Sequence, residues 1–161
     1  MNSFSPPPLP LSRLTAPKLS AEQQSPQRLQ PRPQPPRGSV LIVEDDRAAR
    51  RAIGAILRRQ GYAVSEAGSV AEALQGLACM QPPPDWILLD LMLPDGSGVD
   101  VIRDVRGRGH SSRVCVITGC CVELLDQARR AGAEHAFTKP LDVQRLMTAM
   151  KGRAETHRPA V

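Results

Sequence analysis

The sequence predicts an α/β fold built on a doubly wound parallel sheet of five strands, with helices on both faces. Short apolar runs alternate along the chain with segments of helical periodicity, which is typical of repeated strand-helix units. Two of these runs, at 40–43 and 86–89, are continuously apolar, as expected for strands that are covered on both sides. Reactive side chains follow directly after several runs, as expected where parallel strands end at a ligand site.

The strands are expected at five short runs rich in apolar or β-branched residues. Together with the helices between them, they are expected to form five βα units. A doubly wound arrangement then predicts the strand order 2-1-3-4-5, with the site at the switch point between strands 1 and 3. The predicted strands are residues 40–43, 62–65, 86–89, 114–117 and 136–138.

The helices between these strands carry recognisable start and stop signals. Asp46 precedes the first helix and is suited to cap it, and Gly61 is placed to terminate it. Ser69 and Glu72 have the spacing of a capping box at the start of the second helix, which the prolines at 82–84 must end. The predicted helices are residues 47–60, 70–78, 99–106, 122–131 and 143–151.

The domain organisation follows from composition. Residues 1–38 hold 10 of the 16 prolines and a net charge of +4, out of +5 for the whole chain of 161 residues. This segment lacks a periodic apolar pattern, so we expect a disordered, proline-rich basic tail that acts as a spacer or docks on an aromatic groove. The folded domain is expected at 39–151, followed by a flexible C-terminal tail at 152–161 that is too short to form an output domain.

Acidic groups, a hydroxyl and an amine stand at the ends of the predicted strands. Glu44 and Asp45 follow the first strand, Asp90 the third, Thr118 the fourth and Lys139 the fifth. Carboxylates are the ligands that Mg²⁺ takes together with phosphate oxygens, and a carboxylate can also act as the nucleophile in aspartyl-phosphate chemistry. The lysine and the threonine hydroxyl are suited to bind phosphate oxygens. The pattern therefore indicates a Mg²⁺-assisted phosphoryl-transfer site.

These residues, taken in order, resemble the receiver domain of bacterial response regulators, the CheY-like type with a flavodoxin-like fold. The resemblance covers roughly residues 39–150, and it depends on five short motifs whose order along the chain is more specific than any one of them. The motifs are Val-Glu-Asp-Asp at 43–46, Leu-Leu-Asp-Leu-Met-Leu-Pro-Asp-Gly-Ser-Gly at 88–98, Ile-Thr-Gly at 117–119, Ala-Gly-Ala at 131–133 and Thr-Lys-Pro at 138–140.

The resemblance implies a role for each site residue. Asp90 would be the phosphoacceptor, Mg²⁺ would be bound by Glu44, Asp45, Asp90 and the backbone carbonyl of Met92, and Thr118 and Lys139 would sense the phosphoryl group. It also implies a cis peptide bond between Lys139 and Pro140. The phosphodonor would be a sensor histidine kinase or a histidine phosphotransfer protein. Apart from its own Mg²⁺-dependent phosphorylation and dephosphorylation, the protein would not be an enzyme.

One departure from the family pattern concerns signal output. Receivers usually have Tyr or Phe three residues before the conserved lysine, and this chain has Ala136 there, with Phe137 one place later. The leading interpretation is a single-domain response regulator that signals by phosphorylation-dependent binding of a downstream protein. The alternative is a constitutive interaction module that keeps the fold without switching. A phosphatase of the haloacid-dehalogenase kind ranks last, because Met92 occupies the place of its second acid.

Other classes of partner find little support in the sequence. No helix-turn-helix pattern or set of stacking aromatics accompanies the basic residues, and only 2% of the chain is aromatic, so direct DNA binding is not expected. No apolar run approaches the length of a membrane span or a secretory signal. We therefore expect a cytoplasmic protein without a membrane partner.

Overall fold

The computed structural model describes residues 35–119 and 122–151. These residues form an alternating series of strands and helices. The strands are β1 (Ser39–Val43), β2 (Ala63–Ala67), β3 (Trp86–Leu89), β4 (Met92–Leu93), β5 (Gly96–Ser97), β6 (Arg113–Thr118) and β7 (His135–Thr138). The helices are α1 (Arg47–Arg59), α2 (Val70–Cys79), α3 (Gly98–Gly107), α4 (Val122–Ala131) and α5 (Val143–Lys151).

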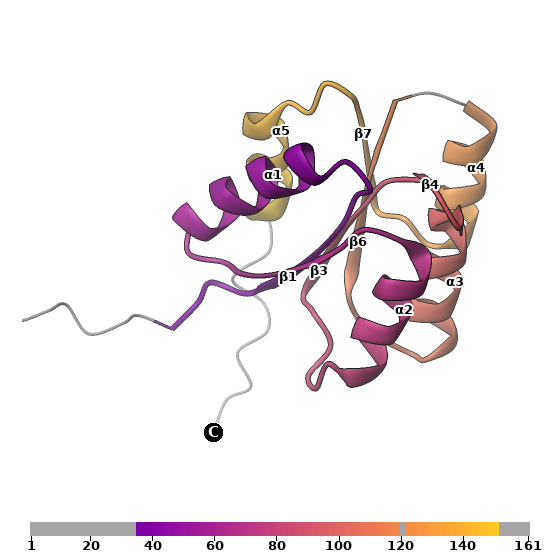
Figure 1. Ribbon diagram of the computed structural model, residues 1–161, viewed down its shortest axis with the longest axis horizontal. Coiled ribbons are helices and arrows are strands. Elements are labelled where there is room, and N and C mark those ends of the chain that lie inside the picture. Colours follow the sequence, from indigo (N-terminus) through magenta and orange to yellow (C-terminus); the bar gives the residue numbers. More distant parts are fainter. Residues whose placement is uncertain (1–34, 120–121, 152–161) are drawn as a thin grey trace, which may run out of the picture. The chain divides into compact units, whose positions relative to one another are not determined.

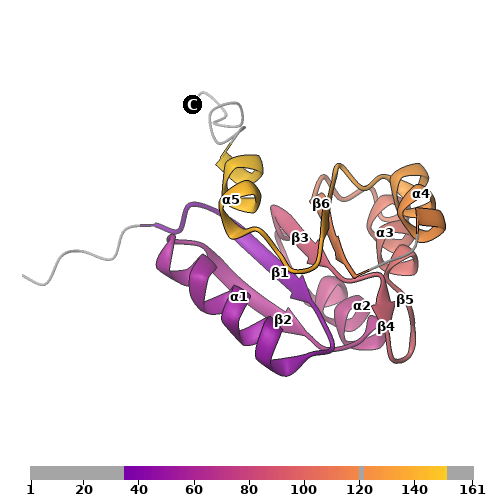
Figure 2. The ribbon, with the colours of Figure 1, turned by 90° about the horizontal axis from the view of Figure 1, so that it is seen from above.

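The main sheet has five parallel strands in the order β2-β1-β3-β6-β7. Because β6 and β7 are the fourth and fifth of the predicted strands, this is the expected order 2-1-3-4-5, and the fold class is confirmed. Helices α1 and α5 cover one face of the sheet, and α2, α3 and α4 cover the other (Figure 1, Figure 2). The strand order reverses at β1 and β3, and folds of this kind bind their ligands beyond the C-terminal ends of the strands at such a point.

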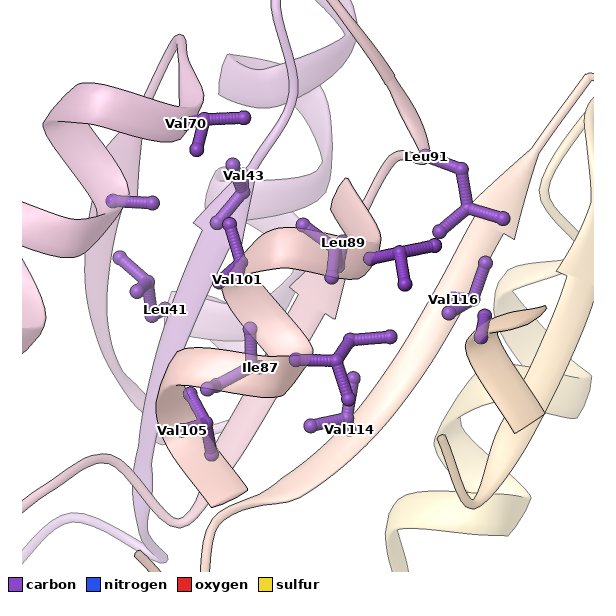
Figure 3. Packing of buried hydrophobic residues seen from close by; sticks show 14 of the residues in the cluster. Leu41, Val43, Val70, Ile87, Leu89, Leu91, Val101, Val105, Val114 and Val116 are labelled. Atoms are coloured by element: carbon purple, nitrogen blue, oxygen red, sulfur yellow. The ribbon is translucent and has the colours of Figure 1, made fainter. Parts of the chain in front are cut away.

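Two apolar layers hold the sheet between its helices. Alternate residues along each central strand point to opposite faces, so Leu41 and Val43 join the layer under α2 and α3, whereas Val40 and Ile42 join the layer under α1 and α5. Figure 3 shows the first layer, in which Ile87 and Val105 pack together with side chains of β1 and β6. Every residue of β3 is buried, which explains why this strand reads as a continuous apolar run.

Several predicted boundaries differ from the structure. The second strand spans Ala63–Ala67 rather than 62–65, because it pairs with the whole of β1 from Ser39 opposite Ala63 to Val43 opposite Ala67. Tyr62 lies outside the strand and is buried against the α1 and α5 layer. The small antiparallel hairpin of β4 and β5 was not predicted, since two-residue strands carry no periodic signal.

The predicted helix caps are confirmed. The Asp46 carboxylate accepts hydrogen bonds from the backbone N–H groups of Ala48 and Ala49 at 2.7 and 3.0 Å. The Ser69 hydroxyl accepts one from the Glu72 N–H at 3.1 Å. Gly61 follows α1 with φ +89°, a conformation that suits a residue without a Cβ atom.

The two predicted tails fall almost entirely outside the described residues. Arg37 and Gly38 already pair beside the second strand, through Arg37 N–H to Gly61 O and Ala63 N–H to Gly38 O, both at 2.9 Å. Within the described ranges, no helix is long and apolar enough to cross a membrane.

Candidate functional site

Asp90 stands immediately after β3, at the C-terminal edge of the sheet. Its N–H donates to the carbonyl of Val43 at 2.9 Å, which keeps it in register beside β1. Only 5% of the residue is exposed. One carboxylate oxygen, Oδ1, accepts from the Met92 N–H at 3.0 Å, and the other, Oδ2, accepts from Lys139 Nζ at 2.6 Å. The carboxylate is therefore held by both of its oxygens at the C-terminal edge of the sheet.

The loop after Asp90 turns back so tightly that only glycine fits at position 98. A Cβ atom on Gly98 would lie 2.2 Å from the Asp90 carbonyl oxygen and 3.0 Å from Leu91 Cα. Gly98 N–H also donates to the Leu91 carbonyl at 3.0 Å. Gly98 belongs to the motif at 88–98, and its packing against Asp90 and Leu91 was not predicted.

The acidic pair lies beside Asp90, at the end of the adjacent strand. Glu44 is 2% exposed, whereas the Asp45 side chain is exposed. Glu44, Asp45 and Asp90 can each offer a carboxylate oxygen within 4.8 Å of those of the other two. Three carboxylates at this separation match the donor set that a hard divalent cation needs, so these residues fit Mg²⁺.

Lys139 connects the two buried carboxylates. Its Nζ lies 2.9 and 2.8 Å from the two oxygens of Glu44 and 2.6 Å from Asp90 Oδ2. Burial raises the pKa of Glu44 above its usual value, and Lys139 only partly opposes that effect. Burial acts to lower the pKa of Lys139, but Asp90 and Glu44 outweigh it, so that pKa is raised and the amine stays charged. The bond between Lys139 and Pro140 is cis, as the resemblance implied.

Thr118 completes the group at the end of β6. The residue is 1% exposed, and its carbonyl accepts from the Lys139 N–H at 2.9 Å. This backbone bond ties the ends of β6 and β7 together. The structure therefore brings Asp90, Glu44, Asp45, Lys139 and Thr118 to one edge of the sheet.

Ala136 and Phe137 lie on opposite faces of β7. Ala136 is exposed, and Phe137 packs against the apolar layer under α1 and α5. Because side chains alternate along a strand, Phe137 cannot take the place of the missing aromatic at 136. The site thus has no aromatic side chain at the position expected to report phosphorylation.

An apolar groove of about 350 Å³ borders Lys139 and Glu44. It runs between α1 and the segment that leads from β7 into α5. Its other lining residues are Asp46, Ala49, Ala52, Ile53, Ile56, Ile117, Pro140, Leu141 and Val143.

Two residues whose side chains hydrogen-bond to the backbone of another segment, Arg50 and Asp95, were not singled out by the sequence. Arg50 donates through one terminal nitrogen to the carbonyl oxygens of Glu44 and Asp45. Asp95 accepts from the N–H groups of Val70 and Ala71 at 2.8 and 2.9 Å, so it caps α2 from the turn between β4 and β5. The Asp95 contacts join residues that are far apart in the sequence, so no local sequence pattern predicts them.

Comparison with curated proteins finds response regulators. The chain is 37% identical over 116 residues to the acid tolerance regulatory protein ActR of Rhizobium meliloti, a match that covers 71% of this chain and 59% of ActR. It is 35% identical over 121 residues to the KDP operon transcriptional regulatory protein KdpE of Escherichia coli, covering 74% of this chain and 52% of KdpE. The match thus spans little more than half the length of these relatives.

Solved structures agree with the fold. A CheY-like receiver domain protein from Methanospirillum hungatei superposes with a TM-score of 0.67 at 26% identity, covering 73% of this chain and 93% of that one. A receiver domain from Bermanella marisrubri gives a TM-score of 0.63 at 30% identity, covering 70% and 94%. Residues 40–151 match the family described as the response regulator receiver domain, so the chain belongs to the receiver-domain family of two-component response regulators.

Proposed function

We propose that Asp90 accepts a phosphoryl group from a sensor histidine kinase or a histidine phosphotransfer protein. An Asp90 carboxylate oxygen would attack phosphorus as the phosphorus–nitrogen bond to the donor imidazole breaks, and the imidazole would leave with a proton. The product is an acyl phosphate on Asp90. The protein is a substrate that assists its own modification and later hydrolysis, and it is not an enzyme with an external substrate.

The observation that carries this proposal is the Lys139 bridge between Glu44 and Asp90. The ammonium offsets part of the negative charge of two buried carboxylates and stands 2.6 Å from the proposed nucleophile, where it can also bind a phosphoryl oxygen. A response regulator from Burkholderia pseudomallei, 27% identical with a TM-score of 0.65 and a match over 72% of this chain and 68% of that one, was solved with a phosphorylated aspartic acid and a calcium ion.

The remaining residues have distinct roles in the proposed reaction. Mg²⁺ would supply positive charge that offsets the repulsion between the carboxylate and the incoming phosphate. Glu44, Asp45, Asp90 and the Met92 carbonyl would hold the ion. The Met92 N–H orients Asp90 through Oδ1, which leaves Oδ2 beside Lys139. The Thr118 hydroxyl would donate a hydrogen bond to a phosphoryl oxygen.

Phosphorylation by acetyl phosphate tests the assignment directly. The full chain is incubated with radiolabelled acetyl phosphate, with and without Mg²⁺, and labelled protein is quantified. We expect Mg²⁺-dependent labelling of the wild type and none of Asp90→Asn. Asp100→Asn is the matched control, since Asp100 is exposed on α3 and pairs only with Arg103 among the described residues. Equal labelling of Asp90→Asn and the wild type would refute the assignment.

For signal output, we propose phosphorylation-dependent binding of a downstream protein, as in a single-domain response regulator. The acyl phosphate on Asp90 would carry about two negative charges where the free carboxylate carries one, and this change would shift an existing equilibrium toward the binding state. Lys139 would transmit this change, so Lys139→Ala should accept phosphate but lose the difference in partner affinity. An unchanged affinity ratio in that variant would count against its signalling role.

A second candidate function is a constitutive interaction module, and the exposed Ala136 favours it. Hydrogen exchange on the phosphorylated and unphosphorylated chain separates the two candidates. A switching receiver should change protection in β7 and α4, whereas a constitutive module should change only the residues that touch the phosphoryl group.

A further inference from the structure

The Arg50 side chain braces the backbone of the acidic pair from within α1. Arg50 lies in the first turns of the helix, and its side chain reaches back toward the end of β1. One terminal nitrogen donates to the Glu44 carbonyl and, at 3.2 Å, to the Asp45 carbonyl. Its Nε lies 3.8 Å from Glu66, and only 17% of the side chain is exposed.

These contacts act on the two residues whose carboxylates must converge. Glu44 N–H is bonded to the Ala67 carbonyl at 3.1 Å, and Asp46 is held by its cap on α1. Arg50 secures the two carbonyls between these points. The guanidinium is planar and permanently charged, so the hydrogens on this one nitrogen point in fixed directions and a single side chain can restrain two consecutive peptide units.

We propose that Arg50 is a positioning residue for the Mg²⁺ site, holding the Glu44–Asp45 backbone so that both carboxylates face the ion. This inference rests on the metal site of the proposed function. Groups that orient metal ligands without touching the metal commonly change metal affinity by about 10-fold to 100-fold when they are removed.

A simple electrostatic role for Arg50 predicts the opposite effect. A cation close to a divalent metal repels it, so removing the charge would tighten Mg²⁺ binding. If Arg50 instead positions the Glu44–Asp45 backbone, removing its side chain would weaken Mg²⁺ binding. The sign of the change in affinity therefore separates the two roles.

Arg58 provides a matched control within the same helix. It also pairs with Glu66, at 2.7 Å, but its other contact is the Val64 carbonyl at 3.5 Å, and it does not touch the acidic pair. Arg58→Gln therefore removes an α1 charge and a Glu66 partner while leaving the backbone of Glu44 and Asp45 untouched.

Calorimetric titration of the full chain with Mg²⁺ gives the test. We expect Arg50→Gln to bind Mg²⁺ about 10-fold more weakly than the wild type. Arg50→Lys, which keeps the charge but loses the planar guanidinium, should fall between them. Arg58→Gln should match the wild type. Labelling of Arg50→Gln by acetyl phosphate should recover at saturating Mg²⁺, because positioning affects occupancy of the site more than the nucleophile.

Several outcomes would overturn the inference. Equal or tighter Mg²⁺ binding by Arg50→Gln would do so, as would equal weakening by Arg58→Gln. If Arg50→Gln does not fold, wild-type Mg²⁺ affinity in Arg50→Lys would overturn the proposed positioning role of the guanidinium. A wild-type chain that binds no Mg²⁺ would overturn the proposed metal site together with this inference, whereas equal binding by wild type and Arg50→Gln would overturn this inference alone.

Discussion

Gly98 shows how closely the backbone approaches the Asp90 carbonyl. A methyl group at this position would meet the Asp90 carbonyl at 2.2 Å, so Gly98→Ala must displace the backbone that carries Asp90. We expect a loss of about 1–3 kcal/mol in the free energy of unfolding, as for other overpacked sites. Urea unfolding monitored by circular dichroism measures it.

The other end of α3 supplies the control for this substitution. A Cβ atom on Gly107 would meet no atom of the rest of the described chain within 4 Å, apart from its chain neighbours and the backbone of its own helix. Gly107→Ala should therefore leave the free energy of unfolding unchanged or raise it slightly. A similar loss of stability in both variants would contradict the steric explanation for Gly98.

Glu44 is predicted to lower the stability of the metal-free protein. Its pKa is raised by burial, so the folded state binds a proton more readily than the unfolded state does. Stability contributed by this group therefore falls as pH rises from the ordinary value of 4.5 through the raised pKa, and the cost is fully present above it. Glu44→Gln should accordingly be more stable than the wild type at pH 7 without Mg²⁺.

The pH dependence provides the check on this prediction. The stability difference between Glu44→Gln and the wild type should shrink as pH falls below the raised pKa, where the wild-type carboxyl is also neutral. Glu123→Gln, on the exposed surface of α4, should show no such gain at pH 7. A less stable Glu44→Gln at pH 7 would mean that the Lys139 contact outweighs burial.

At the scale of elements, Asp95 joins the hairpin of β4 and β5 to α2. Its carboxylate accepts from two N–H groups at the start of the helix, and those bonds hold its pKa below the usual 3.8. An acidic group whose pKa is lower in the folded state than in the unfolded state stabilises the fold at pH values above its unfolded-state pKa. This stabilisation is lost as pH falls through the folded-state pKa.

Replacing Asp95 should therefore lower Tm at neutral pH. Asp95→Ala should lose more than Asp95→Asn, which keeps one acceptor, and both differences should shrink below pH 3.8. Scanning calorimetry of these variants beside Asp126→Asn, an exposed α4 control, measures the effect. A drop in Tm that persists unchanged at acid pH would contradict a charged cap.

Some features of the helices and strands could be predicted from the sequence alone, and others could not. The apolar run of β3 and the helix caps at Asp46 and Ser69 are formed by residues that are close together in the sequence. The fold class, strand order and helix starts were therefore predictable. The placement of the five site residues at one edge followed from parallel strands. The length of β2 depended on pairing with β1, and the contacts of Arg50 and Asp95 depended on tertiary packing, which no local pattern encodes.

The orientation of Phe137 in β7 is a second example. The sequence placed an aromatic residue one position after the expected one, and only strand alternation in the folded sheet decides which face it occupies. Its side chain packs under α1 and α5, so the face that carries Ala136 lacks an aromatic side chain from either residue.

For the molecule as a whole, Mg²⁺ binding should be linked to global stability. An ion that binds only the folded state adds RT ln(1 + [Mg²⁺]/Kd), or about 1.4 kcal/mol at a concentration ten times Kd. We expect the urea midpoint of the wild type to rise with Mg²⁺ but not with K⁺ at equal ionic strength. Asp45→Asn should unfold like the wild type without Mg²⁺, since its side chain is exposed, and should gain much less when Mg²⁺ is added.

In the same titration with Mg²⁺, the order of stability of Glu44→Gln and the wild type should reverse. Without the ion, the variant is expected to be the more stable, because it avoids a buried charge. As Mg²⁺ increases, the wild type gains stability that the variant cannot, since a neutral amide is a weaker ligand for a hard cation. The two curves should therefore cross, and parallel curves for wild type, Glu44→Gln and Asp45→Asn would place the stabilising ion outside the acidic cluster.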